Sequence, residues 1–458
     1  MKILGIPLVI ALIVLAGQAF NANAQTLTTL WSFTNGLDGA TPEAGLVQGN
    51  DGNFYGTSFF GTLFRISSSG NFTNLYALHQ PVSDGVLPGG GLVQGRDGNF
   101  YGTTYLGGAN GSGSVFRISP NGIFSNLYSF SGTDGAEPQG GLVQGTDGNF
   151  YGTTYYGGAS PNCMGGCGSV FKISPGGSFT NLYSFDSSQA GYFPAAGLVQ
   201  GNDGNFYGTT YLGGINNNWG SVFRISPSGS FTNLYTFKGL GDGANPAAAL
   251  VLGTDGNFYG TTRSGDTVFR INPAGSFTNL HTFGGSDGSS PNGLVQGSDG
   301  NFYGTAENGG TSGSGTVFRI SPNGSFTNLY FFGGGNGAGP FGGLVQGSDG
   351  NFYGTTAGGG TSTNCSGGCG TVFKFSVPLS PRPNQISGIK LSGTNIVFNI
   401  PSVARETYQL QFSSSMKPTN WINVAGASVT NSIGALLTVT NFGGASQPQG
   451  FYRFDITP

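Results

Sequence analysis

The chain has 458 residues, a formal net charge of −3 and only 8% charged residues. Because no basic stripe is present, its charge gives little support for nucleic-acid binding, and we expect none. Its 88 glycines and 22 prolines approach a level typical of disorder, but aromatic residues reach 13% and the glycines recur at a strict period. The composition therefore indicates an exported β-protein that uses glycine in turns and packing.

Residues 1–24 predict a secretory signal peptide. Lys2 precedes an apolar run that starts at Ile3, and small residues at Ala22 and Ala24 form a cleavage site before Gln25. An uncleaved membrane anchor is the alternative. We expect a mature chain without a membrane span, secreted or retained at the cell surface or in the periplasm.

A repeated unit fills the chain from there to Val377. Its opening, GLVQG, recurs at steps of about 44 to about 56 residues, the period range of propeller blades. Each copy has four strand-like runs, GLVQ, FYGTT, VFRI and FTNLYSF, here called strands a to d, and its turns carry the glycine that hairpins need. The seven copies begin at Gly45, Gly91, Gly141, Gly197, Ala249, Gly293 and Gly343.

The seventh copy lacks strand d, whereas residues 26–33, TLTTLWSF, have its pattern and precede the first copy. A ring that takes its last outer strand from the N-terminus has no exposed edge. The sequence therefore predicts an all-β, seven-bladed β-propeller over residues 25–377, closed by an N-terminal strand that pairs with residues 372–375.

Two charges recur in every blade, an aspartate after strand a and a cation in strand c. Strands a and c run the same way, so we expect the two to meet at one face as structural pairs. The aspartates are Asp51, Asp97, Asp147, Asp203, Asp255, Asp299 and Asp349. The cations are Arg65, Arg117, Lys172, Arg224, Arg270, Arg319 and Lys374.

The b–c loops and the d–a connections emerge at the opposite face. The connections repeat Asp-Gly-x-x-Pro, which an Asx turn preset by proline explains without function. One carboxylate per blade falls short of the about six to eight oxygens that calcium prefers, so we predict no metal site, and we expect no cofactor.

The b–c loops differ most between blades, and loops on a rigid scaffold commonly carry recognition. Aromatic rings flanked by glycine suit stacking on sugars or peptides, although they could instead cover neighbouring loops. The predicted ligand-binding residues are Tyr105, Tyr155, Tyr156, Tyr211 and Trp219.

Blades five and six carry charge in the same loops, at Arg263, Asp266 and Glu307. Two carboxylates on adjacent blades could form a glycosidase pair, but the sequence does not fix their separation. These three residues are the only catalytic candidates, and with histidine only at His79 and His281 a histidine-based triad is not expected.

The four cysteines form two local pairs, Cys163 with Cys167 and Cys365 with Cys369, in the b–c loops of blades three and seven. In an exported chain, an even count at matched spacing favours disulfides over thiolate metal sites.

The repeated motif GLVQGxDGNFYGTTxxGG…GxVFRISPxGxFTNLYSF resembles the GloVer-type tandem repeat of exported bacterial proteins described as choice-of-anchor. The resemblance covers about residues 26–375 and implies a propeller. It implies no catalytic residue and no ligand.

After Val377 a proline-rich stretch, 378–385, predicts a linker. In residues 386–458, short strand-like runs of alternating apolar and polar residues predict a small antiparallel β-sandwich. This segment resembles fibronectin-III-like or Ig-like modules, and we expect Trp421 in its core.

Two functions remain open. The favoured one is an exported, monomeric, non-enzymatic protein that binds a glycan or a cell-surface protein through a propeller face. The runner-up is a carbohydrate-active enzyme, a glycosidase or lyase, that uses the loop carboxylates of blades five and six.

Overall fold

A computed structural model describes residues 25–78, 82–160, 162–187, 191–214, 218–239 and 241–377, together with six strands between residues 388 and 457. This part of the chain is β-structure apart from one 3₁₀ turn, η1 (Val82–Asp84). The expected signal peptide (1–24), the linker (378–385) and Trp421 lie outside the described residues.

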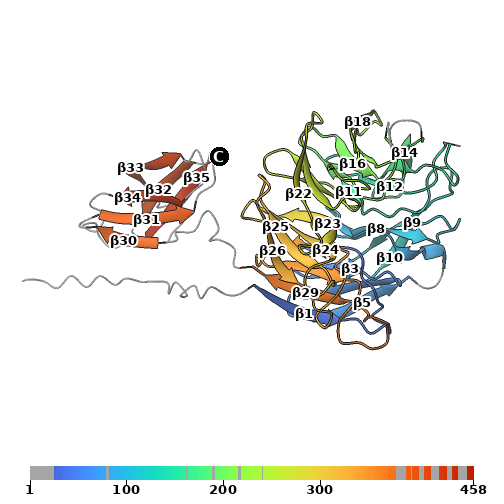
Figure 1. Cartoon of the computed structure of the whole chain (residues 1–458), viewed down its shortest axis with the longest axis horizontal. Coiled ribbons are helices and arrows are strands. Elements are labelled where there is room, and N and C mark those ends of the chain that lie inside the picture. Colours follow the sequence, from blue (N-terminus) through green and yellow to red (C-terminus); the bar gives the residue numbers. More distant parts are fainter. Residues whose placement is uncertain are drawn as a thin grey trace, which may run out of the picture.

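Seven antiparallel sheets form the blades of a propeller (Figure 1), as the repeat predicts. Blade one contains β2 (Val47–Gln48), β3 (Phe54–Thr57), β4 (Thr62–Ile66) and β5 (Phe72–Ala77). Blade two contains β6 (Val86–Pro88), β7 (Val93–Gln94), β8 (Phe100–Leu106), β9 (Ser114–Ile118) and β10 (Phe124–Ser129). Blades three and four contain β11 (Val143–Gln144), β12 (Phe150–Thr154), β13 (Ser169–Ile173), β14 (Phe179–Ser184), and β15 (Val199–Gln200), β16 (Phe206–Thr210), β17 (Ser221–Ile225), β18 (Phe231–Thr236).

The remaining blades repeat the same order of strands a, b, c and d. Blades five and six contain β19 (Val251–Leu252), β20 (Phe258–Thr262), β21 (Thr267–Ile271), β22 (Phe277–Thr282), and β23 (Ser289–Gln296), β24 (Phe302–Asn308), β25 (Thr316–Ile320), β26 (Phe326–Phe331). Blade seven contains β27 (Val345–Gln346), β28 (Phe352–Thr356), β29 (Thr371–Ser376) and β1 (Thr26–Ser32).

Strand β1 lies in the position of strand d in blade seven. It pairs antiparallel with β29, with Leu27 opposite Phe375, and Figure 1 shows the blue β1 beside the orange β29. The Trp31 ring stacks on Phe72 at 4.5 Å, in the way that tyrosines of the other d strands stack on the next blade. The N-terminal strand therefore makes the contacts that the repeat assigns to strand d.

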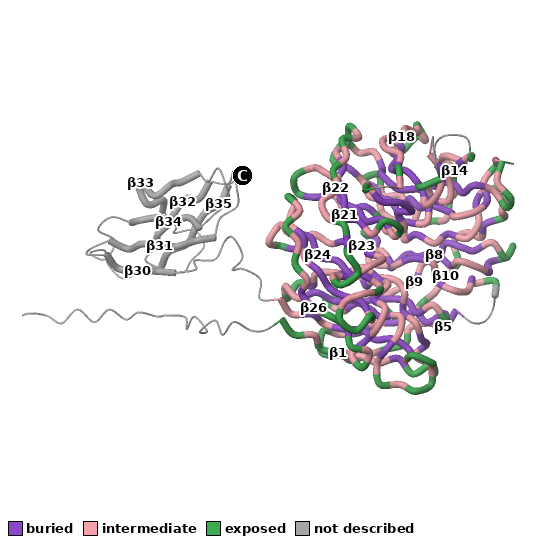
Figure 2. The backbone as a smooth tube through the Cα atoms, viewed as in Figure 1, coloured by how far each residue is buried: buried purple, intermediate pink, exposed green. Residues whose placement is uncertain are grey.

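Strand b holds neighbouring blades together through aromatic pairs. Its tyrosine stacks on the strand-b phenylalanine of the next blade, with ring centroids 3.9–4.2 Å apart, around the whole ring. Such pairs contribute about 0.5–1.5 kcal/mol each beyond the area that they bury. Figure 2 shows that buried residues lie along the strands and that most exposed residues lie in the loops.

The glycine in the middle of strand b makes room for the blade core. A Cβ on Gly152 would lie 2.6 Å from Cζ of Phe171 and 2.7 Å from Cδ2 of Leu142. Because real Cβ contacts are not this short, the FYGTT glycine allows strands a and c to pack across it.

Most turn aspartates do not form the expected salt bridge to the strand-c cation, although the charge of the cation still acts on them, as Arg65 does on Asp51. The aspartate instead binds within its own hairpin: Asp51 Oδ2 accepts the side-chain amide of Asn53 and the hydroxyl of Tyr55, each at 2.8 Å. The same two bonds recur in every blade. Among the described residues the aspartate forms a salt bridge to the cation only in blade seven, where Lys374 lies 3.1 Å from Asp349.

A glutamine at the end of strand a ties each blade to the blade before it. Gln144, for example, accepts the backbone amide of Arg96 at 3.0 Å and donates to Gly148. Equivalent inter-blade bonds come from Gln48, Gln94, Gln200, Gln296 and Gln346. Blade five has Leu252 at this position, which cannot accept, so this contact is lost between blades four and five.

The C-terminal strands form two three-stranded sheets. One has the order β30 (Gly388–Ser392), β31 (Asn395–Pro401), β34 (Leu436–Asn441). The other has the order β33 (Ile422–Thr430), β32 (Thr407–Ser413), β35 (Phe451–Thr457).

Candidate functional site

Two positions in each blade vary in chemistry where the b–c loops meet the d–a connections. The first position directly follows the FYGTT strand, and the second directly precedes the proline of the connection. The two positions of a blade lie side by side; for example, the Tyr155 amide donates to the Glu137 carbonyl at 3.1 Å. The first positions are Phe59, Tyr105, Tyr155, Tyr211, Arg263, Glu307 and Ala357. The second positions are Thr41, Leu87, Glu137, Phe193, Asn245, Ser290 and Gly339. We call these residues the variable ring.

All seven second positions have a left-handed backbone, with φ between 53° and 60°. Six of them are not glycine, and such a conformation costs about 1–3 kcal/mol for a residue with a side chain. The b–c loop of the preceding blade holds them in place: the Phe193 amide donates to Cys167 O at 2.9 Å and the Thr41 amide to Cys369 O at 2.8 Å. The fold therefore accepts strain at the positions that display different side chains.

Aromatic residues of blades three and four gather on one side of the variable ring. Phe193 stacks on Tyr155 at 4.9 Å between centroids and meets Tyr156 edge-on at 5.0 Å. Burial, followed by the nearby hydroxyls of Tyr156 and Tyr211, raises the pKa of Tyr155 to about 12. The structure thus brings together tyrosines that the sequence placed on separate loops.

Glu137 introduces a carboxylate between these rings. Burial and then a hydrogen bond to this carboxylate raise the pKa of the Tyr105 hydroxyl, with smaller contributions from Tyr156 and Tyr155. The Oε2 atom of Glu137 is buried and has no hydrogen-bond partner among the residues that the structure describes. We call Tyr105, Glu137, Tyr155, Tyr156, Phe193 and Tyr211 the aromatic arc.

Trp219, the fifth predicted ligand residue, packs elsewhere in its loop. A Cβ on Gly239 would lie 2.6 Å from Trp219 Nε1, so the indole covers this glycine, and the residue is 38% exposed. Its carbonyl accepts the Asn245 amide at 2.8 Å, while Asn245 Nδ2 donates to Tyr211 O at 2.9 Å. Trp219 therefore supports the loop beside the arc.

The other side of the variable ring is charged. Arg263 forms a salt bridge to Glu307 at 2.7 Å and lies over the Phe341 ring at 5.0 Å. Burial, and then the charge of Glu307, raise the pKa of Glu43, while Arg263 acts in the opposite direction. We call Glu43, Arg263, Glu307 and Phe341 the charged arc.

Asp266, the third catalytic candidate, is engaged separately. Its Oδ1 accepts the backbone amide of Ser290 at 2.5 Å, and its own carbonyl accepts the Phe283 amide at 2.8 Å. Glu307 is bound by Arg263 and is coupled to Glu43, so the two candidate carboxylates have different partners.

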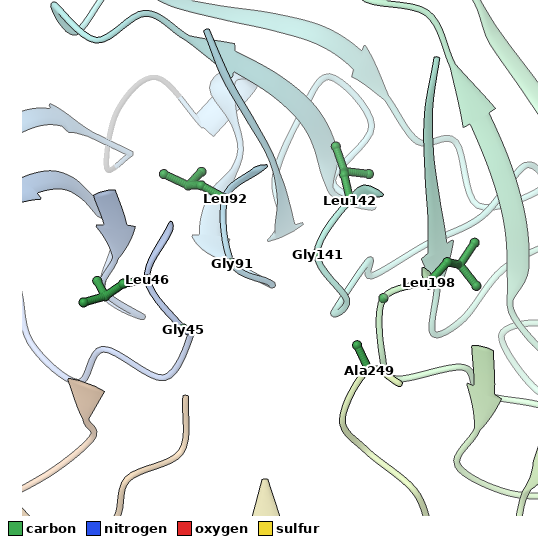
Figure 3. A pocket seen from close by; sticks show the side chains of 9 residues that line it. Gly45, Leu46, Gly91, Leu92, Gly141, Leu142, Leu198 and Ala249 are labelled. Atoms are coloured by element: carbon green, nitrogen blue, oxygen red, sulfur yellow. The ribbon is translucent and has the colours of Figure 1, made fainter. Parts of the chain in front are cut away.

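The centre of the propeller holds a cavity of about 280 Å³. Figure 3 shows that the labelled leucines at the starts of the a strands point away from its open middle. The lining consists of Gly45, Leu46, Gly91, Leu92, Gly141, Leu142, Gly197, Leu198 and Ala249. This lining offers no ionisable side chain, so the polar chemistry of this face lies on the variable ring.

Both cysteine pairs form disulfides, Cys163–Cys167 and Cys365–Cys369, as their spacing predicts. Each places a backbone carbonyl under a second-position residue of the variable ring, Cys167 under Phe193 and Cys369 under Thr41. The first disulfide thereby supports the aromatic arc, while the second supports the ring on blade one.

Within the described residues, no three His, Cys, Asp or Glu side chains come together in a way that could hold a metal ion. The same part of the chain contains no helix long and apolar enough to cross a membrane.

Sequence reasoning missed Glu137, Phe193 and Glu43. Glu137 lies in an Asp-Gly-x-x-Pro connection and Phe193 in the equivalent Ala-Gly-x-x-Pro connection, which we interpreted as turns alone. The available signal was variation at one fixed position, from threonine to phenylalanine, inside an otherwise constant motif.

The sequence model of the Gloeobacter/Verrucomicrobia repeat matches residues 16–218, 58–267 and 199–381. The chain belongs to this repeat family. No curated protein sequence matches it. Within the Gloeobacter/Verrucomicrobia repeat family, then, the activity of this chain has to be argued from its own site.

Solved structures share the fold of this Gloeobacter/Verrucomicrobia repeat chain. Virginiamycin B lyase from Staphylococcus aureus matches with a TM-score of 0.56 and 17% identity, over 77% of this chain and 99% of the lyase. The extracellular domain of a hybrid two-component system from B. thetaiotaomicron matches with a TM-score of 0.54 and 14% identity, over 94% of this chain and 55% of that one. At these identities the similarity shows the fold alone, because one propeller fold serves many chemistries.

Proposed function

We propose that the chain is an exported, non-enzymatic, monomeric binding protein that presents the aromatic arc to a carbohydrate or a cell-surface ligand. The stacking of Phe193 on Tyr155 is the observation that carries this proposal. It supports recognition because rings with apolar faces and polar tips bind sugars and peptides at low entropic cost. The variable ring differs from blade to blade, as a binding site on a symmetric scaffold must.

We further propose the architecture in which this face is displayed. A signal peptide at 1–24 directs export, β1 closes the propeller, and residues 386–458 form a fibronectin-III-like or Ig-like spacer or attachment module. The two disulfides support an oxidising location, at the cell surface, in the periplasm or outside the cell. Structural relatives that are extracellular domains are consistent with that location.

The experiment that tests the binding function compares three alanine variants of the mature chain on glycan and peptide arrays. Tyr155→Ala and Phe193→Ala remove the stacked pair, whereas Phe59→Ala changes the same ring position in blade one. We expect the first two variants to lose retention and Phe59→Ala to keep it, with thermal unfolding showing all three folded. Equal retention by all four proteins, or no retention of the unmodified chain, would contradict the proposal.

A carbohydrate-active enzyme is the second candidate, and the charged arc favours it. Burial and the Glu307 charge favour the protonated form of Glu43, which a general acid requires, while Glu307 stays paired with Arg263. Glu43 and Glu307 are therefore better candidates for a carboxylate pair than Asp266 and Glu307. Release of new reducing or unsaturated ends from polysaccharides, lost in both Glu43→Gln and Glu307→Gln but kept in Asp266→Asn, would establish this activity.

A further inference from the structure

Glu137 places a carboxylate inside the aromatic arc without a cation to neutralise it. Its described neighbours in the site are tyrosines, among them Tyr105, whose pKa is raised by burial and then by Glu137. The variable ring has one cation, Arg263, which is already paired with Glu307 at 2.7 Å. The carboxylate therefore brings into the arc an acceptor group with no cation partner among the described residues.

The position of the Glu137 carboxylate determines where a compensating donor can come from. Oε2 is buried and has no partner among the described residues, so no donor of the described chain reaches it from the protein side. Leaving a carboxylate oxygen buried and unpaired costs more than an unmade neutral hydrogen bond. Oε2 itself is not accessible, so a cation on the ligand side of the arc would offset part of that cost through its attraction to the carboxylate as a whole.

The rings around Glu137 favour the same kind of group. Tyr155 and Phe193 stack with an interplanar angle of 20°, and Tyr156 meets them at steep angles. The Glu137 charge acts on Tyr155, so the carboxylate lies near these rings. An ammonium group near aromatic faces gains about 0.5–2 kcal/mol from the ring quadrupole, in addition to its attraction to a carboxylate. A neutral hydroxyl gains neither to the same extent.

We propose that the aromatic arc selects amino sugars that carry a free ammonium group, with the sugar ring on the stacked Tyr155–Phe193 pair and the ammonium facing Glu137. This inference rests on the proposed binding function and names its ligand class. A strained left-handed backbone at Glu137, φ 55°, holds the carboxylate at this place in the ring.

The test is isothermal titration of the mature chain at about pH 6 with three tetrasaccharides, of glucosamine, of N-acetylglucosamine and of glucose. We expect the glucosamine tetramer to bind about ten- to a hundredfold more tightly than the other two. Glu137→Gln, which keeps the shape of the side chain, removes that preference, and raising the salt from about 50 mM to about 500 mM reduces it. Asp299→Asn, a loss of one carboxylate in a turn of the opposite face, leaves the preference intact.

The outcomes separate this inference from the binding function. If all three tetrasaccharides bind alike and Tyr155→Ala abolishes binding, the arc is a sugar site and the ammonium preference is wrong. A preference that survives in Glu137→Gln also overturns the inference. If none of the three binds, both the ammonium preference and a sugar-binding function for the arc fail.

Discussion

Tyr353 of the last blade stacks on Phe54 of the first, with ring centroids 3.9 Å apart. The same geometry joins all the remaining pairs of neighbouring blades. The inner part of the ring is thus continuous through seven blades. At the outer edge β1 is the fourth strand of the blade-seven sheet, beside β29.

The first prediction concerns this N-terminal strand. Trp31→Ala removes the stack on Phe72 and the bond from Nε1 to Asp38, so we expect a loss of about 2–4 kcal/mol in the free energy of unfolding. Trp219→Ala, at a half-exposed tryptophan in a loop, is the control and should cost less than about 1 kcal/mol. Urea unfolding followed by far-UV circular dichroism measures both; equal stability of the two variants would show that β1 does not close the ring.

The second prediction concerns the inter-blade glutamines. Gln144→Leu removes a bond to the Arg96 amide and should cost about 0.5–1.5 kcal/mol in the free energy of unfolding. Leu252→Gln would supply the contact missing between blades four and five, and should raise stability by a smaller amount because Leu252 also packs against the blade core. Paired urea titrations test this, and a stabilising Gln144→Leu would refute it.

The third prediction is a loss of stability at acid pH. Burial acts to raise the pKa of Asp349, but hydrogen bonds from Tyr353, Asn351 and Lys374 outweigh it and hold the pKa at about 2. The same turn lowers the pKa of Asp51, Asp97, Asp147, Asp203 and Asp255.

Because these folded-state values lie below the unfolded value of about 3.9, the carboxylates stabilise the chain above about pH 4. That contribution is lost as the pH falls from about 4 towards about 2. When thermal unfolding is measured from about pH 7 to about pH 2, its midpoint temperature should fall within this window. The midpoint of Asp349→Asn should fall less steeply with pH than that of the unmodified chain. A flat profile below pH 4 would contradict the assignment.

The fourth prediction uses the two disulfides as matched controls. Replacing Cys163 and Cys167 by serine loosens the carbonyl that holds the Phe193 amide, so we expect weaker ligand binding. The same change at Cys365 and Cys369 affects the Thr41 side of the ring and should leave binding unchanged. Titration with the best-binding ligand measures the affinity of both variants. Equal affinities would show that the first disulfide does not support the binding site.

The repeat predicted the blades because its signals are local: turn glycines, alternating aromatic strands and a fixed period specify each hairpin. The pairing of the turn aspartates with strand-c cations was confirmed as a salt bridge only in blade seven, among the described residues. Asp51 reaches Asn53 and Tyr55 within its own hairpin, and these near donors outcompete a cation on another strand.

The aromatic arc could be predicted only in part. The tyrosines after strand b were visible as exceptions in a constant motif. Phe193 and Glu137 also vary at a fixed position, but a residue before proline normally has an extended backbone, and nothing in the sequence indicates that it turns left-handed toward the preceding blade. The mutual approach of residues on different blades depends on ring closure, which no single repeat encodes.

Hydrogen–deuterium exchange of the mature chain tests the central claim, that recognition occurs on the aromatic arc, most directly. The probe is the tightest-binding tetramer among those of glucosamine, N-acetylglucosamine and glucose. We expect added protection in peptides that contain Tyr105, Glu137, Tyr155 and Phe193, and no change in the Asp-Gly-Asn turns of the opposite face. Protection confined to those turns, to the charged arc or to the C-terminal strands would contradict the account.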